Sequence, residues 1–248
     1  MVDPRLSVIN ARLNRISRII AVSSGKGGVG KSVVATTLAF ALARCGCKVG
    51  LFDLDFTGPS THIIVGAHQV QPKEEKGIIP PTVDGLKYMS LIYFVGDKPT
   101  PFRGEDTSNA LIELLTITLW GKLDFLVIDM PPGIGDAFLD LVRLIHRIEF
   151  LIVTTPSMLA FETVKKQSEL LCEQKMQIIG LIENMKADKS ESVELGTRRL
   201  GLMYLGAIPF DPQVEEAIGK PQKLMQTSAA EALRKIAETA ILKGKNQR

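Results

Sequence analysis

Short apolar runs recur along the chain and predict the strands of a buried sheet. Each run holds four to six residues and is rich in Val, Ile and Leu. A strand that is apolar on both faces is typical of a parallel sheet with helices packed on each side. The runs cover residues 19–22, 49–52, 125–128, 150–153, 178–182 and 203–208.

Helical patterns lie between most of these runs. An N-terminal helix is expected within residues 1–17, because Asp3-Pro4 is typical of a helix start and apolar residues then share one face. The other helical patterns cover residues 32–44, 137–147, 160–173 and 229–242. Strands and helices that alternate at this spacing predict an α/β fold, with a doubly wound, mostly parallel sheet flanked by helices.

One segment, residues 67–96, departs from this alternation. It contains Pro80-Pro81, a turn signal at Asp84-Gly85 and an apolar run at 89–95. These features predict an excursion with a hairpin or an edge strand. Since the chain has no clear linker, repeat or low-complexity segment, we expect residues 1–248 to form a single domain.

Composition narrows the class of protein. The 248 residues are 45% hydrophobic and 23% charged, which is ordinary for a globular protein. The net charge of +3 is too small to favour nucleic acid as the main partner. Three cysteines form no disulfide framework and indicate a reducing compartment. With no bilayer-length apolar stretch and no signal peptide at the N-terminus, we expect a cytoplasmic protein that does not act at a membrane.

A glycine-rich loop separates the first apolar run from the helical pattern that follows it. Residues 25–32 match the phosphate-loop pattern Gly-x-x-x-x-Gly-Lys-Ser in the required place, after a strand and before a helix. Backbone N–H groups and the helix N-terminus attract phosphate oxygens, Lys31 reaches the β- and γ-phosphates, and Ser32 ligates Mg²⁺. A glycine-rich turn without a ligand is the alternative. The nucleotide-binding residues expected in this loop are Gly25, Lys26, Gly27, Gly28, Val29, Gly30, Lys31 and Ser32.

Carboxylates follow two of the predicted strands. Asp53 and Asp55 end the second run, and Asp129 ends the third. In a doubly wound sheet ligands bind at the carboxyl ends of the strands, so these side chains are expected near the phosphates. Asp129 is the expected acidic partner of Mg²⁺. Of Asp53 and Asp55, one can join the metal shell and the other can orient water. The alternative is that one of them caps a helix, and this alternative fits Asp55 better than Asp53.

A proline- and glycine-rich segment follows Asp129. Pro132, Gly133 and Gly135 predict a switch loop, because glycines let a backbone N–H move toward a γ-phosphate and away again after hydrolysis.

Lys26 is an extra feature, because a generic phosphate loop has no need of a lysine there. With it, the loop resembles the deviant phosphate loop of the MinD/ParA/Mrp class of ATPases. This resemblance implies a homodimer with two ATP molecules at its interface, in which Lys26 reaches the phosphates bound by the partner and acts in catalysis beside Lys31. It also implies that Asp55 positions the attacking water, which leaves Asp53 for the metal shell. The alternative for Lys26 is a solvated loop lysine.

Further motifs are similar to those of the Mrp/ApbC group, which bind and transfer iron–sulfur clusters. The motifs are Asp-Phe-Thr-Gly-Pro-Ser at 55–60, Trp-Gly-Lys-Leu-Asp at 120–124, Asp-Met-Pro-Pro-Gly at 129–133, Glu-Asn-Met at 183–185 and Ile-Pro-Phe-Asp-Pro at 208–212. The resemblance covers about residues 19–240. It implies that Asn184 and the backbone near Pro209 contact adenine. The alternative to an adenine contact is that Asn184 is a turn residue at the end of a strand.

One part of the Mrp/ApbC pattern is missing. Cluster-binding members carry Cys-x-x-Cys soon after Glu-Asn-Met, whereas residues 186–194 contain no cysteine. We therefore expect no iron–sulfur ligands at the usual site, and whether a cluster is carried stays open. Cys45 and Cys47 would point to the same side if Cys47 began a strand, and could then ligate a metal. Burial as small core residues is the expected alternative for both, and Cys172 is also expected in the core.

The sequence thus predicts an ATPase. We expect a dimeric switch that binds Mg²⁺ and ATP, hydrolyses ATP slowly and resembles Mrp-type iron–sulfur cluster carriers, with a client that the sequence does not name. The alternative is a MinD/ParA-like positioning ATPase that acts on DNA or membrane. Against it, the amphipathic segment 231–242 carries two glutamates and no aromatic anchor, so we expect it to pack on the domain.

Overall fold

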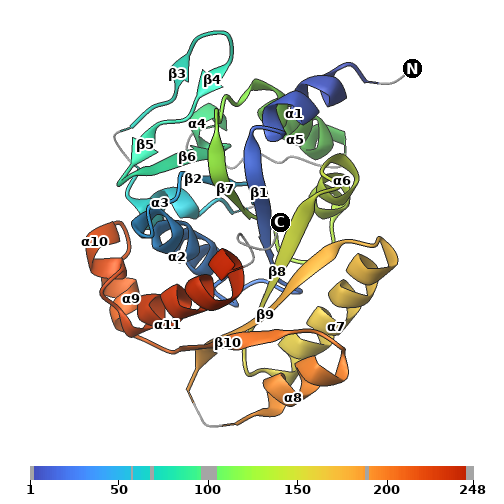
Figure 1. Ribbon diagram of the computed structural model, residues 1–248, viewed down its shortest axis with the longest axis vertical. Coiled ribbons are helices and arrows are strands. Elements are labelled where there is room, and N and C mark those ends of the chain that lie inside the picture. Colours follow the sequence, from blue (N-terminus) through green and yellow to red (C-terminus); the bar gives the residue numbers. More distant parts are fainter. Residues whose placement is uncertain (1–2, 57, 68–69, 96–104, 188–189, 244–248) are drawn as a thin grey trace.

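A computed structural model describes residues 3–56, 58–67, 70–95, 105–187 and 190–243. It confirms the α/β fold, with one mostly parallel sheet between two layers of helices (Figure 1). The strand order is β10-β9-β8-β1-β7-β2-β6-β5, and every neighbouring pair is parallel except β5 and β6. The strands of this sheet are β1 (Ile16–Ser23), β2 (Val49–Asp53), β5 (Thr82–Val83), β6 (Leu86–Ser90), β7 (Leu123–Asp129), β8 (Ile148–Thr154), β9 (Gln177–Lys186) and β10 (Tyr204–Pro209).

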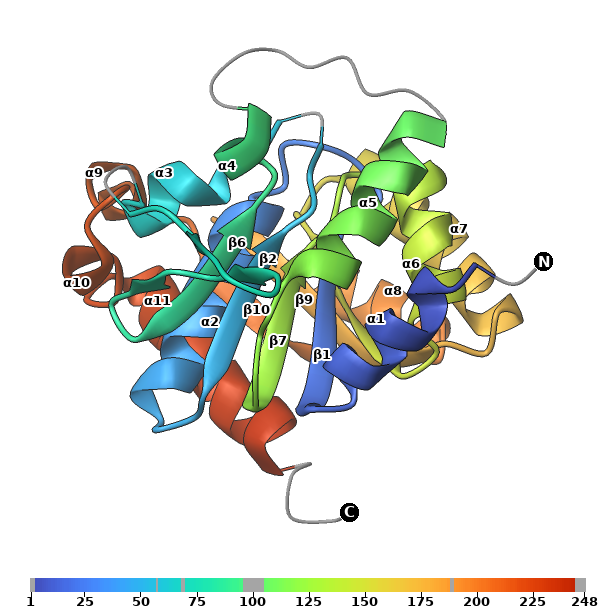
Figure 2. The same ribbon diagram turned by 90° about the horizontal axis from the view of Figure 1, so that it is seen from above.

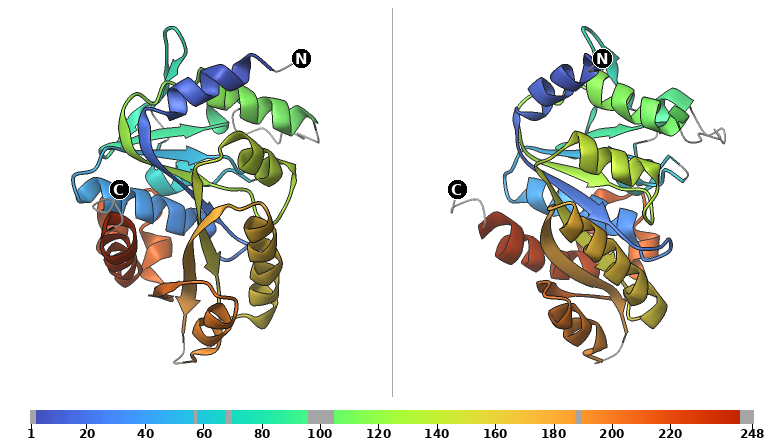
Figure 3. Two further views of the ribbon diagram at one scale, coloured as in Figure 1. Left: turned by 45° about the vertical axis from the view of Figure 1, so that its right-hand side comes forward. Right: turned by 90° about the vertical axis from the view of Figure 1, so that its right-hand side faces the viewer.

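Helices cover both faces of the sheet. Figure 3 shows the blue α2 and the red α11 on one face and the golden α7 on the other. The first face carries α2 (Lys31–Arg44), α3 (Thr61–Val65), α9 (Gln213–Glu216), α10 (Pro221–Leu224), α11 (Ser228–Ile236) and the π-helical continuation Ala237–Leu242. The second face carries α1 (Arg5–Leu13), α5 (Glu105–Ile117), α6 (Asp136–Leu144), α7 (Met158–Glu173) and α8 (Ser192–Arg199).

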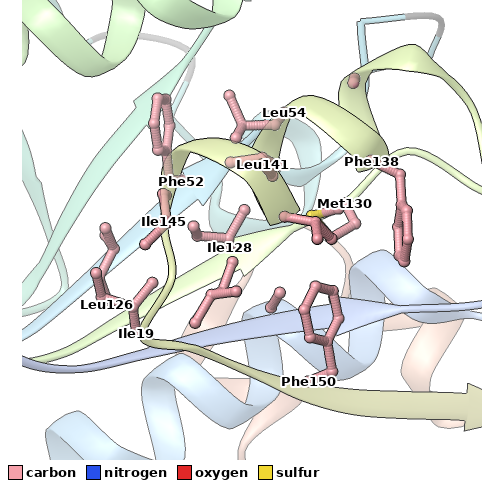
Figure 4. Close-up of a cluster of buried hydrophobic side chains, with 14 of the residues drawn as sticks. Ile19, Phe52, Leu54, Leu126, Ile128, Met130, Phe138, Leu141, Ile145 and Phe150 are labelled. Atoms are coloured by element: carbon pink, nitrogen blue, oxygen red, sulfur yellow. The ribbon is translucent and has the colours of Figure 1, made fainter. Parts of the chain in front are cut away.

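The apolar runs supply two cores at once, because successive residues of a strand point to opposite faces. In β1, Ile19 packs into the core under α6 and α7, while Ile20 packs into the core under α2 and α11. Figure 4 shows the first core, which holds the strand residues Ile19, Ile128 and Phe150 together with Leu141 of α6. The sequence pattern of strands apolar on both faces follows from this double coverage.

Two element boundaries differ from the sequence interpretation. The N-terminal helix ends at Leu13 rather than near residue 17, because Ile16 already pairs with Leu123 as the first residue of β1. The apolar run 89–95 is not one element, since β6 ends at Ser90 and a short helix, α4 (Ile92–Val95), follows.

The segment 67–96 contributes more to the sheet than an excursion would. β6 pairs in parallel with β2, and β5 adds an antiparallel edge strand beside it. β3 (Lys73–Glu74) and β4 (Ile78–Ile79) form a separate antiparallel hairpin. Residues 68, 69 and 96 lie outside the described residues.

The fold places the ends of the central strands side by side. β1 lies between β7 and β8, and β2 lies next to β7. The loops that leave β1, β2 and β7 therefore meet at one edge of the sheet, together with α3 and α4 (Figure 2). None of the helices in the described ranges is long and apolar enough to cross a bilayer.

Candidate functional site

The glycine loop connects β1 to α2 at the carboxyl edge of the sheet. Gly30 is the N-cap of α2 and has φ +76°, a conformation that side chains disfavour. A Cβ atom on Gly30 would also collide with the Asn184 amide of β9, which would have to move. Gly25 is similarly close to Thr163 of α7. The loop is therefore fitted between two elements that lie far from it in the sequence.

Lys31 lies against a strand carboxylate at the base of the loop. Its Nζ donates to Asp129 Oδ1 at 2.5 Å and lies 3.4 Å from Ser32 Oγ. The Lys31 side chain is 6% exposed and that of Asp129 is fully buried. Asp129 Oδ2 has no hydrogen-bond partner among the described residues. One carboxylate oxygen thus holds the lysine, and the other is a buried acceptor that remains to be satisfied.

Asp53 faces Asp129 across the β2–β7 pairing, but its oxygens are already used. Oδ1 accepts from the backbone N–H of Asp55 at 3.0 Å, and Oδ2 accepts from Thr61 N at 3.2 Å and Thr61 Oγ1 at 2.6 Å. The Tyr88 hydroxyl lies 3.0 Å from Thr61 Oγ1. Asp53 therefore secures the chain from the end of β2 to the start of α3.

Both buried carboxyl groups have raised pKa values. Burial and, second, the charge of Asp129 raise the pKa of Asp53 to about 7, and the Thr61 hydrogen bond opposes this shift. Burial also raises the pKa of Asp129, while the Lys31 ammonium opposes that change. The cause in both cases is the poor solvation of a carboxylate inside the protein. A second cation at this site would favour the doubly ionised pair.

The residues present fit a magnesium ion. Asp129 offers a buried oxygen acceptor without a partner, and Ser32 carries a hydroxyl at the first turn of α2. No cluster of three or more His, Cys, Asp or Glu side chains suited to a metal occurs within the described ranges. Mg²⁺ takes one or two protein ligands and completes its shell with water and phosphate oxygens, so Asp129 and Ser32 are a sufficient set. Asp53, with three hydrogen bonds to its oxygens, fits a direct ligand less well than Asp129.

The remaining predicted catalytic and switch residues surround this centre. Asp55 is half-buried, and its Oδ1 accepts from Gly58 N at 3.1 Å. Lys26 is half-buried in the loop, and its carbonyl accepts from Ser24 Oγ at 2.9 Å. Gly133 donates its N–H to Ser24 O at 2.9 Å, so the segment with Pro132 and Gly135 is attached to the phosphate loop. Their roles in catalysis stay predictions.

A cavity of about 420 Å³ opens beside the loop. Asn184 lies in its wall, and its Nδ2 donates to Val29 O at 2.8 Å. The cavity is mostly apolar and large enough for a purine base. Its walls include Gly30, Val34, Asn184, Pro209, Phe210 and Leu233. The structure thus brings the predicted residues Asn184 and Pro209 to the same cavity beside the loop.

Three contacts at the site were missed by the sequence analysis. Thr61 binds Asp53 from eight residues away, Thr163 packs on Gly25, and Phe210 lines the cavity with 61% of its surface exposed. The Gly-Pro-Ser turn before Thr61 is the only local signal for the first contact. The other two depend on how distant elements pack, which no spacing along the chain reveals.

The expectations for the cysteines were wrong. Cys45 and Cys172 are exposed and Cys47 is half-buried, so none lies fully in the core. β2 begins at Val49, so Cys47 is not part of a strand and strand alternation does not orient it. After Asn184, still within β9, Met185 has φ +57°, and Lys186 pairs with Glu183 at 2.8 Å.

The C-terminal amphipathic segment packs on the domain, as its pattern predicted. Its apolar residues Leu233, Ile236 and Ile241 are buried, and α11 contacts α2 and β10.

Comparison with known proteins identifies the family. The sequence profile described as "ParA: NUBPL iron-transfer P-loop NTPase" matches residues 15–242. The chain belongs to this family. The match confirms the resemblance to Mrp-type proteins of the MinD/ParA superfamily and shows that the chain is a nucleotide-binding P-loop NTPase.

Individual relatives agree with the family. An iron–sulfur cluster carrier protein of Aquifex aeolicus is 39% identical over 226 residues, which are 85% of this chain and 62% of that protein. The chain thus spans less than two thirds of that relative. A protein of the same description from Methanococcus maripaludis is 36% identical over 260 residues, covering 97% of this chain and 90% of that protein. A nucleotide-binding protein from Archaeoglobus fulgidus, solved with ADP, has a TM-score of 0.76 and 29% identity, covering 89% and 92% of the two chains.

Proposed function

We propose that this NTPase is a dimeric ATP switch, which binds Mg²⁺ and ATP and uses slow hydrolysis to control the assembly or transfer of an iron–sulfur cluster. The observation that carries the proposal is the buried pair of Lys31 and Asp129, with the unsatisfied Asp129 Oδ2, at the base of the P-loop. The ADP complex of the Archaeoglobus protein supports a nucleotide at this loop. The names of the Aquifex and Methanococcus relatives support an iron–sulfur cargo.

Nucleotide binding would rearrange this pair. Lys31 leaves Asp129 for the β- and γ-phosphates, and backbone N–H groups from Gly25 to Lys31 donate to the same phosphate oxygens. Asp129 and Ser32 would then hold Mg²⁺, which when bound neutralises the charge that builds on the phosphate oxygens. Burial raises the pKa of Asp129 and disfavours its charge, so replacing one cation by another keeps the carboxylate compensated.

The other predicted residues complete the reaction. Asp55, at the carboxyl end of β2, orients the attacking water, and the loop of Pro132, Gly133 and Gly135 responds to the γ-phosphate through its link to Ser24. Lys26 extends to the nucleotide of the second subunit and neutralises charge there. Asn184 and the backbone at Pro209 hold adenine, since an amide can both donate to and accept from a purine edge.

Two substitutions test this mechanism. Asp55→Asn should leave the Kd for ATP within about threefold of the parent and slow hydrolysis by about 10²-fold or more, because it loses a group that acts only on the water. Asp84→Asn, an exposed acid in the turn before β6, is the matched control. Isothermal titration gives binding and phosphate release gives turnover. Equal turnover in Asp55→Asn and the parent would remove Asp55 from the mechanism.

Lys26→Ala tests the dimer. It should bind ATP but should not dimerise with a non-hydrolysable analogue, and its hydrolysis should slow by about 10²-fold or more. Lys165→Ala, an exposed lysine of α7, is the control. Light scattering measures the mass with and without the analogue. If Lys26→Ala dimerises and hydrolyses like the parent, Lys26 is a solvated lysine and the partner-reaching role is wrong.

A further inference from the structure

A second cavity, of about 500 Å³, opens between α6 and α7. The two helices follow each other along the face of the sheet opposite to α2 (Figure 3). Its volume is typical of a ligand pocket, but it lies apart from the cavity beside the P-loop and shares no wall residue with it. The wall of this α6–α7 groove includes Phe138, Leu139, Val142, Arg143, His146 and Leu171.

The floor of the groove is apolar and well packed, whereas its rim is open. Phe138 is fully buried, and its ring centroid lies 5.5 Å from that of Phe150 in β8. Val142 and Leu171 are also buried in the core between the helices and the sheet. At the rim, Leu139 leaves 44% of its surface exposed. An exposed leucine beside an apolar hollow is surface that a docked side chain would remove from water with a gain in free energy.

The charged groups of the groove favour a partner with a carboxylate. Arg143 is exposed at the rim and forms no ion pair or side-chain hydrogen bond with any residue in the described part of the chain. Asp140, the acid nearest to it on α6, faces α5, where it accepts from Ser108 Oγ. Among the described residues no Asp or Glu lines the groove. The guanidinium of Arg143 is therefore a free cation above an apolar floor.

We propose that the α6–α7 groove docks a segment of a partner protein that combines large apolar side chains with a carboxylate. The apolar side chains fill the hollow, and the carboxylate accepts two parallel hydrogen bonds from the planar guanidinium of Arg143. Four residues of the wall are exposed to solvent, so the groove is open along its rim. An open groove between two helices suits an elongated segment better than an enclosed small molecule.

Both helices of the groove begin at the candidate nucleotide site. α6 starts at Asp136, directly after the predicted switch loop, and Gly133 of that loop donates its N–H to Ser24 O. α7 carries Thr163, which lies against Gly25 of the P-loop. A movement of the switch loop would therefore shift one side of the groove relative to the other. Docking and ATP binding should then change each other's affinity by the same factor, a consequence that rests on the proposed function.

A random peptide library displayed on phage, selected on the full nucleotide-free chain, tests the groove. Enriched peptides should combine acidic with large apolar residues, and fluorescence anisotropy of labelled copies gives their Kd. Leu139→Glu and Arg143→Glu should each weaken binding at least about tenfold, because each places a carboxylate where the peptide carries an apolar or acidic group. Leu195→Glu and Arg199→Glu, exposed on α8, are matched controls and should bind like the parent. Circular dichroism shows that each variant is folded.

The proposal is wrong if no peptide is enriched, if the enriched peptides lack acids, or if both groove variants bind them like the parent. It is also wrong if light scattering finds a nucleotide-free dimer that Leu139→Glu converts to a monomer, because a second copy then covers the groove. A fatty acid released from the purified chain and lost in Leu139→Glu would assign the groove to lipid instead. If the parent fails to bind ATP but the peptide result holds, the proposed ATP switch is wrong and the docking groove stands.

Discussion

The Lys31–Asp129 pair should stabilise the nucleotide-free protein, and Lys31→Met tests this. Methionine keeps most of the length of the side chain and removes the ammonium. Asp129 would then be a fully buried carboxylate without its cation, beside Asp53. The pair is 6% and 0% exposed, so solvent screening reduces the effect little.

Two estimates of the loss in free energy of unfolding agree. Breaking a buried ion pair on one side typically costs about 3–5 kcal/mol. By the second estimate, Asp129 stays folded by taking up a proton. This costs about 1.4 kcal/mol for each pH unit by which the solution lies above the unfolded pKa of about 4, which is about 4 kcal/mol at pH 7. By this estimate the cost should fall to about 2 kcal/mol at pH 5.5. Because the folded pKa is raised, this loss of stability grows as pH rises and disappears as pH falls.

Urea unfolding followed by circular dichroism, without nucleotide, measures the free energy of unfolding at pH 7 and 5.5. Lys31→Met should be about 3–5 kcal/mol less stable than the parent at pH 7, with a smaller difference at pH 5.5. Lys31→Met/Asp129→Asn should recover most of the loss but still fail to bind ATP. Lys165→Met should stay within about 0.5 kcal/mol of the parent. A Lys31→Met protein as stable as the parent at pH 7, or a difference independent of pH, would refute the reasoning.

Three further outcomes are expected. The pKa of Asp53 is raised to about 7, so the stabilisation from its protonated form is fully present below pH about 4 and is lost as the pH rises through 7. Asp53→Asn should therefore flatten the decline in urea midpoint between about pH 4 and 7. An unchanged slope of urea midpoint against pH would contradict this. Gly30→Ala should lower the free energy of unfolding by about 1–3 kcal/mol, because Gly30 has a positive φ and lies against Asn184. Gly27→Ala, which has open space around it, should leave the free energy of unfolding in urea nearly unchanged. Phe210→Ala should weaken ATP binding about three- to tenfold without changing stability, and equal affinity by calorimetry would exclude a contact with the base.

Much of this protein is determined by local sequence pattern. Strand positions follow from apolar runs, because residues one apart point to opposite faces and both faces are covered by helices. The P-loop is equally local, since one short segment contains its glycines, its lysine and its hydroxyl. The carboxylates of Asp53 and Asp129 could be placed at strand ends for the same reason.

Only the tertiary structure decided which of these groups touch. Asp53 and Asp129 are neighbours through the register of β2 and β7, a pairing between residues 76 positions apart that no local pattern specifies. The contact of Lys31 with Asp129, and the cavity shared by Gly30, Asn184 and Leu233, also depend on long-range packing. The exposure of Cys45 was mispredicted because burial depends on what packs over the end of α2, which composition does not reveal.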